Sequence, residues 1–271
     1  MGQLQVVTKV SKQKRSSNRF NVFLDDKYAF SISEDVYIKF HVHKGKQLTK
    51  QQIDAIKNAD DIQRAYLIAI NYLSYRMRTE SEIKSHLQKK EIVDDVIEKV
   101  IKRLFDEDLL NDQTFAATFV TDRMNRSTKG PNLIRQELAA KGISKCDIDY
   151  ALATFDKVTQ KETALAWGQK EVNKRSKQPL RRRKEQLRTK LLRRGFTKDI
   201  VSGVIDQIEI EVDEQDELLL LKKEADKLYT RYKNKYEDYE LNMQLKKKLY
   251  TRGFSLHQID SYLGKLMNND E

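Results

Sequence analysis

The 271-residue sequence has few of the residues that interrupt regular structure, with 9 glycines and 2 prolines. A β-sandwich or β-barrel needs many tight turns, and glycine and proline form most of them. The scarcity of both residues therefore argues against these all-β classes. It favours helices that are joined by short connections.

Cysteine and histidine are also scarce. Cys146 is the single cysteine, which excludes an intramolecular disulfide. The four histidines, His41, His43, His86 and His257, form no group with metal-ligand spacing, and no glycine-rich phosphate-binding loop is present. We therefore expect no metal site, no cofactor and no hydrolysis of nucleotides by this chain.

Long apolar runs are missing as well. No segment approaches the ~20 apolar residues that cross a bilayer, and the start, Met1-Gly2-Gln3-Leu4, does not read as a secretory signal. We expect a cytoplasmic protein that is monomeric and has no membrane partner.

Charge is what the sequence has in abundance. Charged residues make up 34% of the chain and apolar residues 39%, a balance that suits an elongated helical body with a thin core. The formal net charge is +11. A surplus of this size predicts an anionic partner, with nucleic acid ahead of an anionic membrane surface.

The first forty residues differ from the rest because apolar and polar residues alternate there. A period of two predicts strands, so we expect a small antiparallel β-meander over residues 3–42. Asp25-Asp26-Lys27 is a plausible turn between two strands. The last strand is expected to pass through Val36, Ile38 and Phe40.

A helix is predicted to begin next to Thr49. Thr49 and Gln52 have the spacing of a capping box, and Leu48 and Ile53 have that of a hydrophobic staple. The structure after this point is therefore expected to be helical.

A repeated element follows at intervals of about 50–60 residues. In each copy a leucine is followed four residues later by Gly142, Gly195 or Gly253, and Glu91 takes this place in a divergent first copy. Glycine accepts the left-handed conformation that ends a helix. Because Glu91 lacks this freedom, we expect a different turn geometry there. Apolar residues follow six and ten positions later in every copy: Ile97, Ile101, Ile148, Leu152, Val201, Ile205, Ile259 and Leu263.

Each repeat is predicted to hold three helices. The first helices are expected at about 62–76, 114–124, 162–173 and 218–235. A second helix should begin after Thr79, which has capping-box spacing to Glu82, and Pro131 and Pro179 should each take the first helical position. The third helices are expected to be capped by Ser144, Thr197 and Ser255.

The sequence thus predicts a mainly α fold: an elongated, curved array of four tandem three-helix repeats with a small N-terminal β-meander. The predicted limits are 1–48 for the meander region and 49–110, 111–156, 157–210 and 211–271 for the repeats.

Three stretches of the chain resemble the RecX family of regulatory proteins. The likeness is dense over residues 66–155 and weaker through the later repeats; Thr79 stands where serine is commoner, and Glu91 replaces the usual glycine. The stretches include Tyr75-Arg76-Met77-Arg78-Thr79-Glu80-Ser81-Glu82-Ile83, Leu109-Leu110-Asn111-Asp112-Gln113-Thr114-Phe115-Ala116 and Lys129-Gly130-Pro131.

The resemblance implies a function in DNA repair, recombination and the SOS response. RecX proteins bind the RecA recombinase and its filament on single-stranded DNA, where they lie in the helical groove. They reduce its ATPase, strand-exchange and coprotease activities. The family has no catalytic residues, so the resemblance implies a protein that is not an enzyme.

The main candidate site is a basic cluster at residues 174–198. Glu185 is the single anion in this segment, and the local balance equals the net charge of the whole chain, +11. Such a concentration favours a phosphate-contacting surface over a merely solvated face. On a helix, Arg181, Lys184 and Arg188 would share one side. The cations are Lys174, Arg175, Lys177, Arg181, Arg182, Arg183, Lys184, Arg188, Lys190, Arg193, Arg194 and Lys198.

A second basic set lies near the junction of the first two repeats, and its members are Arg76, Arg78, Arg123, Arg126 and Lys129. Contact with DNA or with the recombinase is slightly favoured for this set. The alternative is that these cations complement the dipoles of helix C-termini.

Two further patterns favour structural interpretations. The acidic run Asp206, Glu209, Glu211, Asp213, Glu214, Asp216 and Glu217 is expected to be an exposed linker. The alternatives are a contact to a basic recombinase surface or an internal brake on the cationic face. Tyr229, Tyr232, Tyr236 and Tyr239 have helical spacing, which favours core packing over base stacking, and Phe155 and Trp167 are also assigned to the core.

Two other functions remain open. Lys141-Gly142-Ile143-Ser144 resembles the turn of a helix-turn-helix, so the chain could be a duplex-DNA-binding transcription regulator. The recurrence of this turn in every repeat suits structural repetition better. A scaffold or a tRNA-modifying accessory enzyme is least supported, because no acid–base constellation is present.

Overall fold

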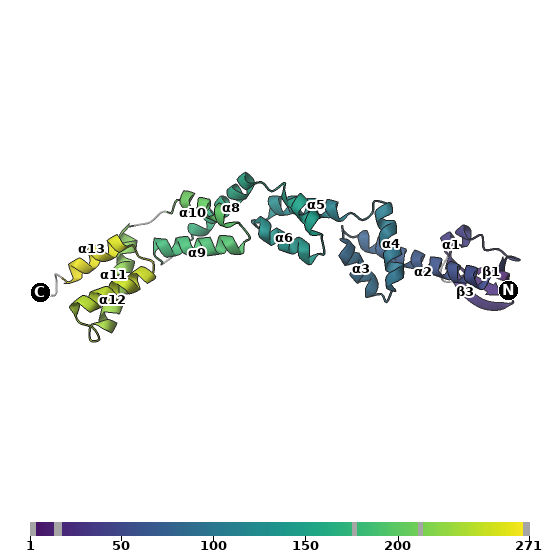
Figure 1. Ribbon diagram of the computed structural model, residues 1–271, viewed down its shortest axis with the longest axis horizontal. Coiled ribbons are helices and arrows are strands. Elements are labelled where there is room, and N and C mark those ends of the chain that lie inside the picture. Colours follow the sequence, from purple (N-terminus) through teal and green to yellow (C-terminus); the bar gives the residue numbers. More distant parts are fainter. Residues whose placement is uncertain (1–3, 14–17, 175–177, 211–213, 268–271) are drawn as a thin grey trace. The chain divides into compact units, whose positions relative to one another are not determined.

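The structure is a computed structural model that describes residues 4–13, 18–174, 178–210 and 214–267. A four-stranded sheet is followed by helices through the rest of the described chain (Figure 1). The chain divides into two compact units, residues 1–116 with 140–147 and residues 117–139 with 148–271. The predicted mainly α fold with a small N-terminal sheet is confirmed.

The sheet has the strand order β3-β2-β1-β4, with antiparallel neighbours. Asp25 and Asp26 form the predicted turn between β2 and β3, with φ angles of 48° and 62°. Two consecutive left-handed residues match the right-handed twist of a hairpin, and aspartate tolerates this conformation. The strands are β1 (Gln5–Lys12), β2 (Arg19–Leu24), β3 (Lys27–Ser33) and β4 (Gln47–Leu48).

The strand predicted through Val36, Ile38 and Phe40 is wrong, because this segment forms the short helix α1 (Glu34–Lys39). Val36 is buried, Phe40 packs against the same core, and Ile38 is exposed. A spacing of four residues places Val36 and Phe40 on one side of a helix. Short apolar runs fit both periods, and the acidic first turn favours the helix here.

The long helix α2 (Lys50–Leu73) joins the sheet to the first set of three helices. Thr49 and Gln52 make both bonds of the predicted capping box. The helix then continues without a break into the predicted first helix at 62–76 and ends at Leu73, three residues before the predicted end. Its first half contributes Ile53 and Ile56 to the core under the sheet, and its second half contributes Ala65 and Ala69 to the core of the helices that follow.

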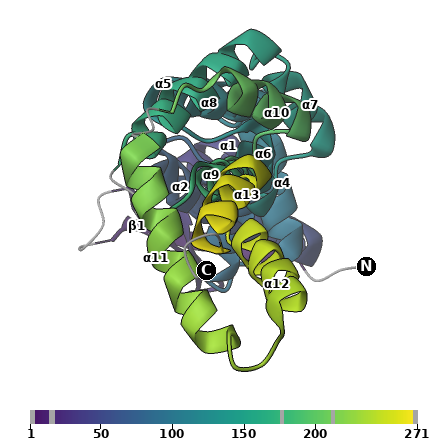
Figure 2. The same ribbon diagram turned by 90° about the vertical axis from the view of Figure 1, so that its left-hand side faces the viewer.

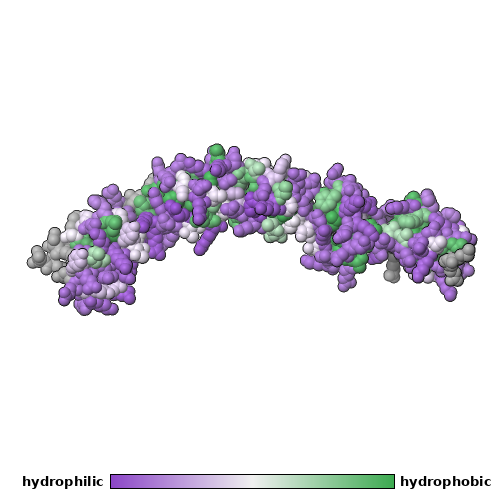
Figure 3. Space-filling view, viewed as in Figure 1, coloured by the Kyte–Doolittle hydropathy of each residue, from purple (hydrophilic) through white to green (hydrophobic). Residues whose placement is uncertain are grey.

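Three-helix sets follow one another along the chain, as predicted. Separate buried cores form within α2–α4, α8–α10 and α11–α13, and Figure 2 shows α11 and α12 side by side, in agreement with their contacts. Hydrophilic side chains cover most of the face in Figure 3. The further helices are α3 (Glu80–Gln88), α4 (Asp94–Asp106), α5 (Asp112–Arg126), α6 (Pro131–Ala140), α7 (Lys145–Leu152), α8 (Lys157–Val172), α9 (Leu180–Arg193), α10 (Lys198–Gln207), α11 (Glu214–Tyr232), α12 (Asp238–Thr251) and α13 (Leu256–Met267).

Glycine ends the second helix of the later sets as predicted. Gly142, Gly195 and Gly253 have φ angles of 80°, 91° and 101°. The predicted difference at Glu91 is wrong, because Glu91 also adopts a positive φ, 60°. The amide of Ile92 donates to the Leu87 carbonyl, and equivalent bonds close the turns at Gly195 and Gly253. A single non-glycine residue can take this conformation at a modest energetic cost.

The three glycines also permit close packing that the sequence did not predict. A Cβ on Gly142 would lie 2.7 Å from Ser81 Oγ, one on Gly195 would lie 2.7 Å from Leu133 Cβ, and one on Gly253 would lie 2.9 Å from Arg182 Cβ. In each case the neighbour stands in the first turn of an earlier second helix. The same turn therefore ends one helix and packs on the start of another.

Helix starts follow the predicted caps with two exceptions. Pro131 opens α6 as predicted, but Pro179 is the cap residue and α9 begins one residue later. Ser144 and Ser255 accept hydrogen bonds from the amides three residues on, as predicted. Thr197 precedes α10 without any side-chain capping bond, so that predicted cap is wrong.

Replacing Thr79 by alanine should lower the free energy of unfolding by about 1–2 kcal/mol. Thr79 is fully buried, its Oγ1 accepts from the Glu82 amide, and the same hydroxyl donates to the Lys141 carbonyl at 2.7 Å. Thr197→Ala is the matched control, because it removes a cap threonine that makes no capping bond. Urea titrations followed by circular dichroism compare the two variants. Equal losses would contradict the role given to the Thr79 hydroxyl.

Candidate nucleic-acid interface

Helix α9 carries most of the predicted basic cluster. Leu187 and Leu191 face the core of the α8–α10 set, so the cations occupy the remaining sides of the helix. Arg175 and Lys177 lie outside the described residues.

One flank of α9 lines an open cleft of about 480 Å³. Arg181, Lys184 and Arg188 all line this cleft, so the structure brings these three together on one side, as their spacing predicted. The opposite wall includes Ser255 and Gln258 at the start of α13. The Ser255 hydroxyl already donates to Gln258 Oε1 at 2.8 Å, so the side-chain NH2 group of Gln258 is the donor on this wall that suits a phosphate oxygen.

The three cations of the cleft are only loosely held by the protein. Arg181 stacks over the Tyr250 ring at 4.1 Å, and the nearest carboxylate oxygen to Arg188, on Glu185, is 3.8 Å away. Lys184 makes no ion pair within the described residues. Glu217 and Asp206 also line the cleft, and Glu217 is committed to a bond from the Leu180 amide at the start of α9.

The other flank of α9 faces α8, where cations surround a carboxylate. Glu171 pairs with Lys174 through one oxygen at 2.5 Å and with Lys190 through the other at 2.6 Å. Hydrogen bonds from these two lysines hold the pKa of Glu171 below its ordinary value. Arg183 lines the same pocket of about 170 Å³ and donates to the Val172 carbonyl.

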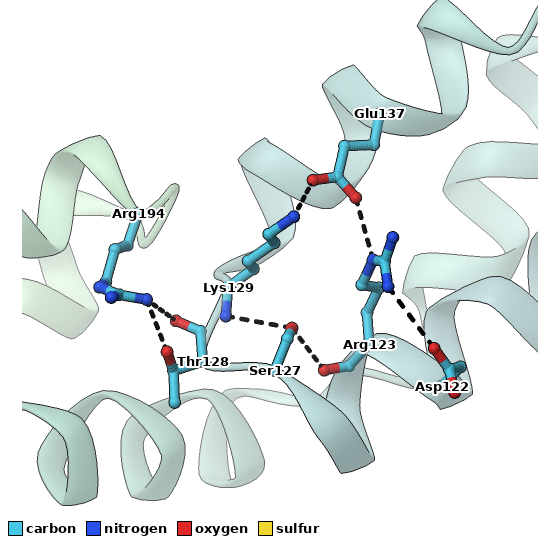
Figure 4. A network of polar contacts seen from close by, with 7 residues as sticks. All are labelled: Asp122, Arg123, Ser127, Thr128, Lys129, Glu137 and Arg194. Atoms are coloured by element: carbon cyan, nitrogen blue, oxygen red, sulfur yellow. Dashed lines mark hydrogen bonds and ion pairs between the residues drawn. The ribbon is translucent and has the colours of Figure 1, made fainter.

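The remaining cations of the basic cluster differ in their exposure. Arg182, Arg193 and Lys198 are exposed and form no ion pair in the part of the chain that the structure describes. Arg194 turns inward instead. Its Nη1 donates to the Thr128 hydroxyl at 2.5 Å (Figure 4). Its guanidinium also stacks on the Trp167 ring at 4.1 Å. Arg194 therefore holds two helix sets of one unit together and is poorly placed for an external ligand.

The later members of the second basic set form a network of their own. Arg123 and Lys129 both pair with Glu137 of α6 (Figure 4). Burial alone would raise the pKa of Glu137, but hydrogen bonds from Lys129 and Arg123 lower it below its usual value. Arg126 is more available, because its side chain is 82% exposed although it pairs with Asp122. Both arginines stand in the last turn of α5, where cations complement the helix dipole.

The earlier members of this set belong to the other compact unit. Arg76 pairs with Glu82 at 3.1 Å. Arg78 stacks on the Tyr72 ring at 3.9 Å, and His86 also stacks on that ring. The structure thus divides the five cations between two units, 76 and 78 in one and 123, 126 and 129 in the other.

The acidic and tyrosine patterns are corrected in part. Glu214, Asp216 and Glu217 form the first turn of α11 and are not linker, whereas Glu211 and Asp213 lie outside the described residues. Tyr239 is 82% exposed, so its assignment to the core is wrong. Helix α11 ends at Tyr232, and the helical spacing therefore does not continue to Tyr239.

Membrane-spanning helices and metal clusters are both missing from the described residues. No helix there is long and apolar enough to cross a membrane. The same residues contain no cluster of three or more histidine, cysteine or acidic side chains that could hold a metal ion.

Comparison with known families gives three matches along the chain. Residues 5–49 match the regulatory protein RecX N-terminal domain, residues 65–104 match the RecX first three-helix domain, and residues 111–152 match the RecX second three-helix domain. The matched ranges begin in β1 and end with α7.

Individual relatives extend the likeness over nearly the whole chain. The regulatory protein RecX of Bacillus subtilis is 41% identical over 258 residues, which cover 95% of this chain and 97% of the relative. That of Oceanobacillus iheyensis is 33% identical over 272 residues, covering 98% and 100%.

Solved structures show the same fold. A crystal structure of regulatory protein RecX has a TM-score of 0.67 and 37% identity, covering 75% of this chain and all of that one. A crystal structure of RecX from Lactobacillus salivarius has a TM-score of 0.53 and 36% identity, covering 55% of this chain and 97% of that one.

Proposed function

Because this chain belongs to the RecX family of regulatory proteins, we propose that it binds the RecA recombinase and its filament on single-stranded DNA and lowers the activity of that filament. The observation that carries the proposal is the match to proteins named regulatory protein RecX over 95% of the chain or more. The activities expected to fall are ATP hydrolysis, strand exchange and coprotease function.

The cations of α9 support a direct contact with the DNA strand. Lys184, Arg182 and Arg193 have no ion pair in the described part of the chain. Lys184 lines the cleft, whereas Arg182 and Arg193, which are eleven residues apart, share another side of the same helix. Each phosphate contact releases counterions and contributes modestly, so several together give an affinity that depends steeply on salt. Such a surface suits a protein that follows a nucleoprotein filament through many weak contacts.

We further propose that the protein acts by binding alone and as a monomer. Its effect then comes from occupying space on the filament and hindering DNA exchange or subunit addition. The cleft along α9 is lined by three cations and three carboxylates, whereas the pocket between α8 and α9 places Lys174, Arg183 and Lys190 around the single carboxylate of Glu171. An excess of cations such as that of the second pocket suits an anion.

The helix-turn-helix alternative is not favoured. Gly142 packs against Ser81, so this turn is part of an internal contact. The turns at Gly195 and Gly253 pack in the same way. A recognition helix would instead need a free face to enter the major groove.

The proposal is tested by adding the protein to RecA-coated single-stranded DNA and following ATP hydrolysis. We expect hydrolysis to fall several-fold at a modest molar excess of this protein over RecA. Unchanged hydrolysis at several-fold excess would contradict the proposal.

A basic protein of similar size and charge from an unrelated fold serves as the control. It competes for the strand through charge alone, so equal inhibition by the control would also count against a specific regulator. Adding the protein before or after RecA has coated the DNA distinguishes an effect on filament growth from an effect on filament turnover.

A further inference from the structure

We propose that the pocket between α8 and α9 is a binding site for one phosphodiester group of the DNA strand, and that Glu171 occupies this site in the free protein. The inference rests on the proposed function and adds a regulation to it. Glu171 would be an internal competitor that must leave before the strand can use Lys174 and Lys190.

The geometry of Glu171 resembles that of a bound phosphodiester. One carboxylate oxygen accepts from Lys174 Nζ at 2.5 Å, and the other accepts from Lys190 Nζ at 2.6 Å. A phosphodiester likewise shares one negative charge between two non-bridging oxygens. Cations that hold two carboxylate oxygens can therefore hold two phosphate oxygens.

The side chains around Glu171 include further donors that suit a phosphate group. Arg183 and Gln186 line the same pocket, which has a volume of about 170 Å³. Arg183 donates to the Val172 carbonyl from the α9 side, which keeps a third cation beside the two lysines. Several donors then converge on one small volume.

Glu171 itself stands at an unfavourable place on its helix. It lies in the last turn of α8, next to the C-terminal residue Val172, where the helix dipole disfavours a negative charge. Its carboxylate is only 16% exposed. The two lysines therefore stabilise the carboxylate there, and their hydrogen bonds lower the pKa of Glu171 below its ordinary value.

On the other flank of α9, no carboxylate of the described chain holds the cations as Glu171 holds Lys174 and Lys190. Glu185 is 64% exposed and approaches Arg188 only to 3.8 Å, while Lys184 has no ion pair among the described residues. Cations on that flank are free to meet a strand at once. Lys174 and Lys190 are not, so the free protein presents fewer available cations than its sequence contains.

The test compares Glu171→Gln with Glu162→Gln, an equal change of charge on the same helix. Glu162 is exposed and has no ion pair in the described chain. Binding to a fluorescent oligothymidylate is measured by anisotropy at a series of salt concentrations. E171Q should bind roughly 5- to 20-fold more tightly than E162Q at low salt, and its log–log salt slope should be steeper by about 0.7, because one more phosphate of the strand is neutralised.

A second pair of variants removes the lysines. K174Q/K190Q should change the affinity of the wild-type protein less than three-fold, because Glu171 already holds these lysines. When the same two substitutions are added to E171Q, the tighter binding of E171Q to the oligothymidylate should be lost. The effect of the two lysine substitutions is thus measured twice, once with Glu171 present and once with glutamine at position 171.

The outcomes separate the inference from the proposed function. Equal affinity and equal slope for E171Q and E162Q would overturn the inference, and the proposed function would stand if the wild-type protein still lowers ATP hydrolysis by RecA on single-stranded DNA. If no protein in the series binds the strand and hydrolysis is unchanged, both fail. The inference is supported if E171Q is the only variant of the series that binds the strand more tightly than the wild-type protein.

Discussion

Replacing Gly195 by alanine is expected to lower the free energy of unfolding by about 3 kcal/mol. The left-handed backbone of Gly195, with φ of 91°, contributes about 1–2 kcal/mol of this loss, because a Cβ is strained there. The rest, about 1–3 kcal/mol, comes from overpacking, since the new Cβ would meet Leu133 Cβ at 2.7 Å. The Leu133 backbone is fixed at the start of α6 and cannot move aside without disturbing that helix.

Two other glycines separate the causes of this effect. Gly45 has φ of 90°, and a Cβ added there would meet nothing within 4 Å, so Gly45→Ala measures strain alone. Gly264 lies within α13 with open space around it, and Gly264→Ala should stabilise the helix by up to about 1 kcal/mol.

Unfolding in urea is followed by the fluorescence of Trp167, the chain's single tryptophan. This residue stacks on Arg194, directly before Gly195, so its emission reports the region of interest. A loss in G195A no larger than that in G45A would contradict the packing role of the glycine.

Replacing Arg181, Lys184 and Arg188 together by glutamine should weaken binding to single-stranded DNA by about 10- to 100-fold at low salt. The three side chains line one cleft and are only loosely held by the protein. Each lost phosphate contact lowers the log–log salt slope by about 0.7, so the slope should fall by about 2. Anisotropy titrations with oligothymidylate give both quantities.

A matched control removes the same charge elsewhere. Lys50, Lys90 and Lys102 are exposed and lie outside the basic cluster. K50Q/K90Q/K102Q changes the net charge by the same amount and should weaken binding less than three-fold. If the two triple variants bind alike, the cleft has no special part in DNA contact and net charge alone controls the affinity.

Signals that act within a few residues could be predicted well from the sequence. The capping boxes at Thr49 and Thr79, the helix start at Pro131 and the glycine turns at Gly142 and Gly195 all depend on short-range geometry. The buried positions six and ten residues after each turn follow from the same periodicity, and all of them are buried. The cation spacing on α9 likewise predicted which three side chains line one cleft.

Errors occurred where a short pattern fits two structures. Val36 and Phe40 suit a strand or a helix, and the acidic residues before them are the feature that favours the helix. The tyrosine spacing looked continuous, but a turn after Tyr232 breaks it and leaves Tyr239 exposed. Thr197 shows that a good capping residue need not make its bond.

Contacts between distant residues could not be predicted from one sequence. Nothing local marks Glu171 as the partner of Lys190, or Thr128 as the partner of Arg194. These contacts decide which members of the basic cluster are available to a ligand. The predicted limits of the repeats, the curvature of the array and the monomeric state remain predictions.

The glycine contacts have a consequence for how such chains change length. Gly195 packs on the first turn of α6, and Gly253 packs on the first turn of α9, through the same kind of joint. If a chain gained or lost one whole set of three helices, the glycine turn of one set would still pack on the first turn of the second helix in the set that now precedes it. Duplication or deletion of a single genetic module could therefore lengthen or shorten the protein without inventing a new interface.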